Sequence, residues 1–402
     1  MREVVIVDAV RTPIGKYNGA LKDVRPDDLG AIVIKALIER NPNLPPKQIE
    51  EVVFGNANQA GEDNRNVARM SGLLAGLPVE VAGTTINRLC GSGMDAIMYA
   101  ARAITVGEGD IFIAGGTESM TRAPLVMAKP DREFPRGNME LVDTTIGWRF
   151  TNKKLENLYG ADTMPKTAEN VAQRFSITRE EQDLFAFESQ QRAKKAMEAN
   201  CFAEEIVPVS YKDRKGNEII VDKDEHPRIG TSLEKLSKLK PLFEGGTVTA
   251  GNASGVNDGA AALLLMSAEK AKELNLKPLA KYITGATAGL EPSVMGLGPV
   301  FASRKALKRA KLGTNDIGLV ELNEAFASQS LECVRQLDLN IEKVNVNGGA
   351  IAFGHPLGAS GARIVTTLLY EMKKKNVQFG LATMCIGVGQ GIATIFENIA
   401  ED

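Results

Sequence analysis

Two cysteines and one histidine lie among glycines, and these residue types can carry out nucleophilic chemistry. Cys90 lies in "INRLCGSGMDA", where the glycines leave room for a large electrophile. His355 lies in "GHPLG" and Cys385 in "MCIGVGQG". A thiol beside an imidazole yields a thiolate nucleophile, and a second thiol can donate or accept a proton. The alternatives are a small buried Cys90, a core Cys385 at a hairpin, or a redox pair of the two, which would be unusual in a reducing compartment.

Other polar residues are weaker candidates. Asn323 and Glu324 follow an apolar run, in "NEAF". The Asn323 amide can orient a water or polarise a carbonyl, although a turn residue with satisfied hydrogen bonds is the alternative, as a plain strand-end carboxylate is for Glu324. The run "GVGQG" at 387–391 lacks the rest of a dinucleotide-binding fingerprint. His226, in "DKDEHPRIG", lies in a polar run and is predicted to be a surface residue.

The composition excludes several classes of protein. The 402 residues are 44% hydrophobic and 24% charged, and a formal net charge of −2 gives no general attraction to nucleic acid or to a membrane. No apolar run reaches the ~18 residues of a membrane-spanning helix, and no secretory signal is visible. The 4 cysteines are far apart and there are only 2 histidines, so no metal site is predicted. A cytoplasmic location fits this pattern.

The chain contains an internal repeat. "QIEEVVFGN" resembles "DIGLVELNE", and "CGSGMDAIMYAARAI" resembles "GASGARIVTTLLYEM". In each copy a short apolar strand precedes a helix with small residues at its start, and a second strand follows. Three pairs of landmarks share one offset of 268 positions: Ile49 and Ile317, Gly93 and Gly361, and Asp110 and Gln378. We therefore predict a duplicated α/β fold, although similar strands recur in any α/β chain.

Helical spacing and end signals support these elements. After Ser92, apolar residues recur at helical spacing up to Ile104, and Gly107 is a typical C-terminal stop. Residues 364–372 repeat the pattern in the second copy. The segment 247–267 is expected to form a glycine-rich turn followed by an apolar helix or strand.

A charged region without the repeat lies between the two copies. It contains Thr178 and Glu181, which are placed as a capping box before a long amphipathic helix. We interpret the region as an inserted cap domain; a helical surface excursion without function is the alternative. The predicted organisation is an N-terminal half (1–118 plus 249–273), an insert (119–248) and a C-terminal half (274–402).

The repeat predicts where the reactive residues meet. Related α/β halves usually pack about a pseudo-twofold axis, so equivalent loops face each other. Cys90 begins the helix of the first copy, His355 leads into the equivalent helix, and Cys385 follows the second strand of the second copy. All three are therefore expected near one point. There the helix dipole should lower the pKa of Cys90, and His355 should accept its proton.

Together, these motifs resemble those of the thiolase family. They follow the family order along nearly the whole chain: "VDAVRTPIGKYNG", "NRLCGSGMDA", "GGTESM", "TVTAGNASGVNDGAA", "LNEAFA", "NVNGGAIAFGHPLGASG" and "CIGVGQG". The resemblance implies the α/β thiolase fold, in which two duplicated halves pack as a five-layered αβαβα sandwich with an inserted loop domain. It also implies acyl transfer between coenzyme A thioesters, with coenzyme A as a substrate and with no bound cofactor or metal.

The resemblance implies a role for each reactive residue. Cys90 would be the nucleophile, His355 its activating base, and Cys385 the group that handles the proton of the acetyl α-carbon. Asn323, through a water, would form one oxyanion site with His355, and the backbone N–H groups of Cys90 and Gly387 would form the other. Cys90 would attack the 3-keto carbonyl of a 3-oxoacyl-CoA, release acetyl-CoA and pass the shortened acyl group to free coenzyme A.

Coenzyme A contacts are placed by the same resemblance. Ser254 matches the position that meets the pantetheine arm, and Arg228 matches a basic residue near the nucleotide end. Four apolar positions would line the tunnel, and the flexible thioethers of the two methionines suit a variable acyl group: Met164, Phe243, Met295 and Phe326.

One departure from the family pattern bears on the substrate. Short-chain biosynthetic members tend to carry a His before the Met of "M-G-x-T-A-E-N", whereas this chain has Thr163 there and Pro165 in place of Gly. "TTIGWRF" and "MPKTAEN" look more like degradative thiolases, including those that cleave 3-oxoadipyl-CoA. We therefore expect a degradative role, with fatty acid β-oxidation as its setting. Arg149 is interpreted as a surface ion-pair residue and is not assigned to a substrate carboxylate.

Three other functions remain open at this stage. They are an acetoacetyl-CoA-forming acetyltransferase, a decarboxylating condensing enzyme, for which a second catalytic His is lacking, and a silent acyl-CoA-binding or scaffolding protein. The resemblance further implies a homo-oligomer, either a dimer or a homotetramer built as a dimer of dimers with contacts from the insert. No nucleic-acid or membrane partner is expected.

Overall fold

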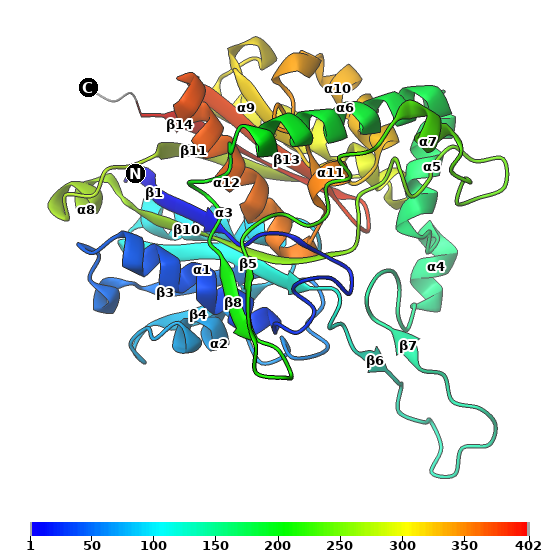
Figure 1. Cartoon of the computed structure of the whole chain (residues 1–402), viewed down its shortest axis with the longest axis horizontal. Coiled ribbons are helices and arrows are strands. Elements are labelled where there is room, and N and C mark those ends of the chain that lie inside the picture. The colour runs from blue at the N-terminus through cyan, green and yellow to red at the C-terminus, as the bar shows by residue number, and fades with distance from the viewer. Residues whose placement is uncertain (1, 400–402) are drawn as a thin grey trace.

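The structure, a computed structural model, describes residues 2–399. One sheet of ten strands runs through the molecule (Figure 1). Its strands are β1 (Val4–Arg11), β2 (Gly15–Lys16), β3 (Glu51–Gly55), β4 (Ala82–Ile86), β5 (Ile111–Ser119), β10 (Asn257–Ser267), β11 (Ala280–Gly289), β12 (Leu319–Leu322), β13 (Phe379–Ile386) and β14 (Gln390–Asn398). The order is β12-β13-β14-β11-β1-β10-β5-β3-β4, and β2 pairs with β10.

Helices cover the sheet and form part of the insert. They are α1 (Pro26–Arg40), α2 (Val67–Leu74), α3 (Ser92–Val106), α4 (Lys153–Tyr159), α5 (Met164–Arg174), α6 (Arg179–Glu198), α7 (Leu233–Ser237), α8 (Ala268–Glu273), α9 (Gly298–Ala310), α10 (Ala327–Leu337), α11 (Ala350–Phe353) and α12 (Leu357–Lys375). None of them, within the described part of the chain, is long and apolar enough to span a membrane.

The internal repeat is confirmed by strand pairing. β3 runs parallel to β5, and β12 runs parallel to β13. The registers match as well, because Glu51 pairs with Phe112 just as Leu319, 268 positions later, pairs with Gly380. In each copy an antiparallel pair of strands then continues the sheet, as β5-β10-β1 and as β13-β14-β11. The segment 257–267, for which helix and strand were both open, is the strand β10.

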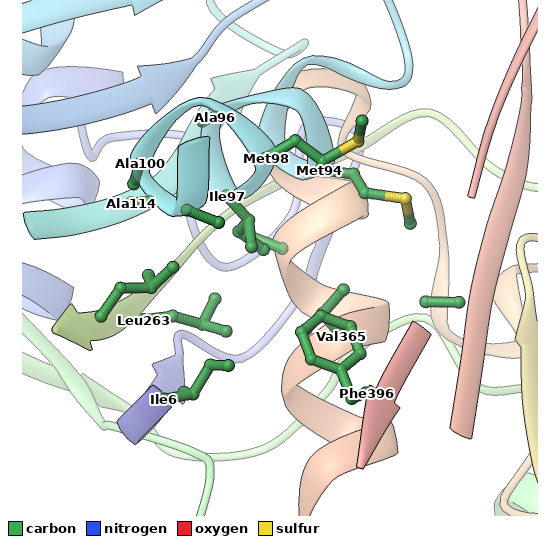
Figure 2. Close-up of a cluster of buried hydrophobic side chains, with 14 of the residues drawn as sticks. Ile6, Met94, Ala96, Ile97, Met98, Ala100, Ala114, Leu263, Val365 and Phe396 are labelled. Atoms are coloured by element: carbon green, nitrogen blue, oxygen red, sulfur yellow. The ribbon is translucent and has the colours of Figure 1, made fainter. Parts of the chain in front are cut away.

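The two units form the five layers predicted from the sequence. α3 and α12 lie between the units, and Figure 2 shows Met94, Ile97 and Val365 of these helices in the core with Leu263 of β10 and Phe396 of β14. α1 and α2 cover the outer face of the first unit, and α9 and α10 cover that of the second. Each outer layer packs on the sheet through its own apolar cluster, so the strands of both units have helices on either face.

The central helices approach closely at two equivalent glycines. A Cβ atom on Gly93 would lie 2.6 Å from the carbonyl oxygen of Gly358, and one on Gly361 would clash with the backbone of Met94. Glycine is therefore required at both positions for the helices to pack. Because the glycines lie near the helix starts, this packing brings those starts together. The predicted end of α3 is also confirmed, since Gly107 follows it with φ 85°.

The insert is tied to both units. The predicted capping box is present, because Thr178 Oγ1 accepts from the N–H of Glu181 at 3.2 Å and Glu181 Oε2 accepts from the N–H of Thr178 at 2.8 Å. α6 packs on α10 and α11 of the second unit. Arg11, at the end of β1, donates to Glu205 at 2.6 Å and to Asp224 at 2.7 and 2.9 Å. The exact domain boundaries remain a prediction.

Short strands complete the insert. They pair as β6 (Leu125–Val126) with β7 (Val142–Asp143), and as β8 (Val209–Lys212) with β9 (Glu218–Val221). The chain between β6 and β7 forms an arm that projects from the body of the molecule (Figure 1). The arm carries exposed apolar side chains, among them Phe134 at 86% exposure.

Candidate active site

A cavity of about 440 Å³ lies where the first unit, the second unit and the insert meet. Cys90, His355 and Cys385 all line it, so the structure brings the three residues together as the repeat led us to expect. The remaining wall comes from the loops after β3 and β5, from residues 144–149, from the start of α5, from the 250–256 loop, and from Met295 and Phe326.

Cys90 lies just before α3, at the cavity wall. The backbone N–H groups of Gly387 and of Cys90 itself donate to its sulfur, which favours the thiolate. Burial is nevertheless the larger effect, and it raises the pKa of the thiol to about 11. The expectation of a lowered pKa is therefore wrong, because removing a charge from water outweighs a few backbone dipoles. The thiol stays protonated at neutral pH unless a base takes its proton.

His355 is held so that one ring nitrogen can be that base. Its backbone N–H donates to Asn257 Oδ1 at 3.0 Å. Its Nδ1 lies 2.6 Å from Ser360 Oγ, and the Ser360 hydroxyl donates to the Pro356 carbonyl at 3.1 Å. Because the Ser360 hydroxyl proton is used in that bond, Ser360 Oγ acts as the acceptor for Nδ1–H of His355. The other ring nitrogen, Nε2, then carries the lone pair. Burial lowers the pKa of His355 to about 3, which keeps the imidazole neutral.

His355 and Asn323 both carry buried side-chain polar atoms that residues 2–399 leave without a hydrogen bond. Nε2 of His355 has no hydrogen-bond partner among the described residues, and neither do Oδ1 and Nδ2 of Asn323. Asn323 is fully buried and is not itself part of the cavity lining; its backbone N–H donates to the Thr383 carbonyl at 3.0 Å. Buried polar atoms are almost always paired, so such an exception indicates a place for a polar ligand atom or a water.

Cys385 lies near the end of β13, and its side chain is 1% exposed. Burial raises the pKa of its thiol, and the neighbouring Cys90 raises it further. A neutral thiol next to a second sulfur is a proton donor rather than a standing nucleophile. All four cysteines of the chain are free in the structure.

Two acidic residues organise the loops around the cavity. Glu118, which was not singled out from the sequence, accepts from the N–H groups of Ala57 and Gly358, both at 2.8 Å. Burial raises its pKa to about 7. Glu324 accepts from Ser189 at 2.7 Å and from Asn345 at 2.8 Å, so it links the second unit to α6 and is not a free strand-end carboxylate. Only the "GGTES" motif offered a signal for Glu118.

The predicted coenzyme A contacts fall into two groups. Met164, Ser254, Met295 and Phe326 line the cavity. Arg228 and Phe243 are not part of the lining: Arg228 is exposed, and Phe243 lies under the Lys166 ammonium, 5.9 Å from its ring centre.

Two sequence interpretations are wrong. His226 is half-buried rather than on the surface: it packs on Gly255, and its Nδ1 lies 3.2 Å from Asn257 Nδ2. Burial lowers its pKa to about 4. Arg149 forms no ion pair with any residue in 2–399, and it lines the cavity. Both errors have one cause: the insert folds back onto the two units, and the residues next to His226 or Arg149 in the sequence do not reveal such docking.

Comparison with known proteins agrees with this geometry. The model of the thiolase N-terminal domain matches residues 4–269, and that of the thiolase C-terminal domain matches residues 276–398. The chain is 57% identical to a β-ketoadipyl-CoA thiolase of Acinetobacter baylyi and 56% identical to a 3-oxoadipyl-CoA/3-oxo-5,6-dehydrosuberyl-CoA thiolase of Escherichia coli. Both matches cover 99% of this chain and 100% of the relative.

A solved structure has the same fold. The acetyl-CoA acetyltransferase of Bacillus anthracis superposes with a TM-score of 0.93 at 42% identity, and the match covers 99% of each chain. Domain models over almost the whole chain, full-length relatives and this superposition all agree. The chain belongs to the thiolase family and is an acyltransferase that acts on coenzyme A thioesters.

Proposed function

We propose that the protein is a degradative thiolase whose substrate is 3-oxoadipyl-CoA. The observation that carries the proposal is the full-length identity of 56–57% to relatives named for this substrate. Thr163, where biosynthetic members tend to carry a His, also favours cleavage. The setting is then the breakdown of a dicarboxylic acyl chain, in place of the fatty acid β-oxidation expected from the sequence.

The first half-reaction makes an acyl-enzyme on Cys90. His355 Nε2 takes the thiol proton, and Cys90 Sγ bonds to the C3 carbonyl carbon of the substrate. The C2–C3 bond then breaks, and its electron pair goes to C2. Cys385 protonates C2, which gives acetyl-CoA and leaves a succinyl group on Cys90.

The second half-reaction releases the product. The Cys385 thiolate takes the thiol proton of free coenzyme A, and that sulfur attacks the succinyl carbonyl. Cys90 leaves as a thiolate and recovers its proton from His355. The products are succinyl-CoA and acetyl-CoA, and the enzyme returns to its starting state without an oxidant, a metal or a further cofactor.

Two donor sets would stabilise the oxyanions. The N–H groups of Cys90 and Gly387 already point at the Cys90 sulfur and would serve a carbonyl bonded to it. The unpaired atoms of Asn323 and His355 would serve the thioester carbonyl, with a water bridging to Asn323. Loss of one such donor typically costs about 3 kcal/mol of transition-state stabilisation.

Coenzyme A would enter past the insert. Ser254, on the cavity wall, would meet the pantetheine arm, with Met164, Met295 and Phe326 as apolar walls. Arg228, which is exposed, would meet the nucleotide end in solvent, and Phe243 would contact the arm beyond the cavity.

The test is a panel of thiolysis rates with free coenzyme A. The 3-oxoacyl-CoA substrates are acetoacetyl, 3-oxohexanoyl, 3-oxoadipyl and a long-chain member. We expect the highest kcat/KM for 3-oxoadipyl-CoA. A preference for acetoacetyl-CoA would instead make the protein an acetyl-CoA acetyltransferase, and activity with malonyl thioesters but not with coenzyme A would make it a condensing enzyme.

We also propose that the chain forms a dimer or a dimer of dimers. Exposed apolar side chains on the arm, namely Met127, Phe134 and Leu141, support a contact between copies. A solution mass of one chain would refute it. A cytoplasmic location remains a prediction from the cysteine pattern.

A further inference from the structure

We propose that Arg149 binds the terminal carboxylate of the acyl chain and thereby selects dicarboxylyl-CoA substrates. The inference rests on the proposed function and adds the residue that would recognise the second carboxylate. Arg149 belongs to the stretch 144–149 of the insert, which lines the same cavity as Cys90 and His355. A second, wider hollow of about 1000 Å³ lies beside the arm, and Arg149 lines it too. Arg149 therefore lies between this hollow and the cavity that holds Cys90.

The charges of the cavity make Arg149 the available partner for an anion. Within residues 2–399 it is the only Arg or Lys that lines the cavity. The two carboxylates of the lining are already engaged: Glu118 by backbone N–H groups and Asp162 by Asn170 Nδ2 at 2.8 Å. A carboxylate that leaves water for this mostly apolar space needs a cation or several donors to compensate for its lost hydration.

The guanidinium is held by neutral groups only. Nη1 lies 3.4 Å from Asn58 Oδ1 and from the Thr144 carbonyl, and Nη2 donates to the Asn58 carbonyl at 3.0 Å. No carboxylate of the described residues lies within ion-pair distance of it. Nε–H and the second Nη2 proton have no partner among those residues. These donors suit the paired oxygens of a carboxylate, which arginine binds in a fork geometry.

The surroundings fix the position of this group before a substrate arrives. The Trp148 indole N–H donates to the Asp162 carbonyl at 3.2 Å, and Asn58 N–H donates to Glu118 at 3.1 Å. Phe150 has φ 52°, a left-handed conformation that a bulky residue adopts only where its neighbours impose it. A cation fixed in advance loses little entropy when it binds.

The same contacts link Arg149 to the nucleophile. Asn58 follows Ala57, whose carbonyl accepts from Asn87 Nδ2 at 3.1 Å, and Asn87 Oδ1 accepts from the N–H of Leu89 at 2.9 Å. Leu89 precedes Cys90. The loop that holds Arg149 is therefore joined by hydrogen bonds to the residue next to Cys90. A succinyl group places its carboxylate two methylenes beyond the carbon attached to Cys90.

The experiment compares two substrates that differ only at this end. In 3-oxohexanoyl-CoA a methyl group replaces the terminal carboxylate of 3-oxoadipyl-CoA. The variant Arg149→Gln removes the charge but keeps an amide donor for Asn58 or Thr144. Arg304→Gln is the matched control, because Arg304 is exposed, lies outside the cavity and donates to the Gln336 carbonyl at 2.7 Å.

We expect Arg149→Gln to lower kcat/KM for 3-oxoadipyl-CoA by about 100-fold, because the substrate carboxylate loses its charged partner, and to change kcat/KM for 3-oxohexanoyl-CoA by less than about threefold. Arg304→Gln should change neither. If the wild-type enzyme does not prefer the diacid, the proposed substrate is wrong. The wild-type enzyme can also prefer the diacid while Arg149→Gln keeps that preference or loses kcat/KM equally for both substrates. The role of Arg149 is then overturned and the proposed substrate stands.

A second readout does not depend on a folded glutamine variant. Added KCl should reduce the wild-type preference for the diacid, because the contact is between a cation and an anion at a partly exposed site. Arg149→Lys keeps the positive charge but cannot bind a carboxylate with two parallel N–H groups, so it should retain part of the preference for the diacid. A diacid preference that neither salt nor the lysine variant alters would overturn the proposal.

Discussion

The starts of α3 and α12 are equivalent in the repeat and opposite in their chemistry. Both helices begin with small residues, and both pass through a glycine at the point of closest approach, Gly93 in one and Gly361 in the other. Yet the loop before α3 supplies the sulfur of Cys90, and the loop before α12 supplies the imidazole of His355. Duplication thus provides one scaffold twice, and in the proposed mechanism one copy supplies the nucleophile and the other the base.

The difference extends to how each residue is held. The sulfur of Cys90 accepts hydrogen bonds from backbone N–H groups, whose positions do not depend on particular side chains. His355 depends on the side chains of Asn257 and Ser360, one from β10 and the other from α12. We infer that the nucleophile is positioned by the fold itself and the base by specific neighbours.

The largest expected effect comes from removing the two reactive groups one at a time. Cys90→Ala should lower the thiolysis kcat by about 10⁴-fold or more, because no acyl-enzyme can form. His355→Ala should cost nearly as much, since the Cys90 thiol with a pKa of about 11 then has no base. The measurement is a rate assay on both variants, with folding checked by circular dichroism. Near-normal turnover in Cys90→Ala would end the proposed mechanism.

A smaller effect tests the symmetry of the central helices. Gly93→Ala and Gly361→Ala each place a methyl group against the backbone of the opposite helix, so both should lower the free energy of unfolding by about 1–3 kcal/mol. Gly313→Ala is the control, because its added Cβ has no contact closer than 3.7 Å. Urea unfolding of the three variants measures this. Equal stability of all three would mean that the close crossing is not required.

The smallest effect is a shift in a pH profile. Burial lowers the pKa of His355 to about 3, so the imidazole is already in its base form at pH 5 and loses that form only as the pH falls toward 3. The kcat/KM profile should therefore lack an acid limb near the ordinary histidine value of about 6.5. An acid limb near that value in the wild-type enzyme would contradict the burial of His355. Activity from pH 4 to 8 is measured in buffers of constant ionic strength.

The meeting of the reactive residues could be predicted from the sequence because the internal repeat is visible there. The offset between the copies predicted that Cys90, His355 and Cys385 meet, and motif resemblance added Asn323 and Gly387. The contacts of Ser360 and Glu118 were not predicted, because a serine or glutamate in a motif does not show which loop it faces.

The errors are instructive in the same way. The pKa of Cys90 was expected to fall because the helix dipole is visible in the sequence, whereas the burial that outweighs it is a property of the packed chain. His226 was assigned to the surface because its neighbours in sequence are polar, and Arg149 was interpreted as a surface ion-pair residue. Both residues lie in the insert, and its docking onto the two units determines where they face.

The most direct test of the central claim is to trap the acyl group. The enzyme is incubated with 3-oxoadipyl-CoA without free coenzyme A, quenched in acid, digested and analysed by mass spectrometry. We predict a succinyl adduct on the peptide that carries Cys90, lost when coenzyme A is added before the quench and absent from Cys90→Ala. An adduct on Cys385, or turnover without any adduct, would contradict the assignment of Cys90 as the nucleophile.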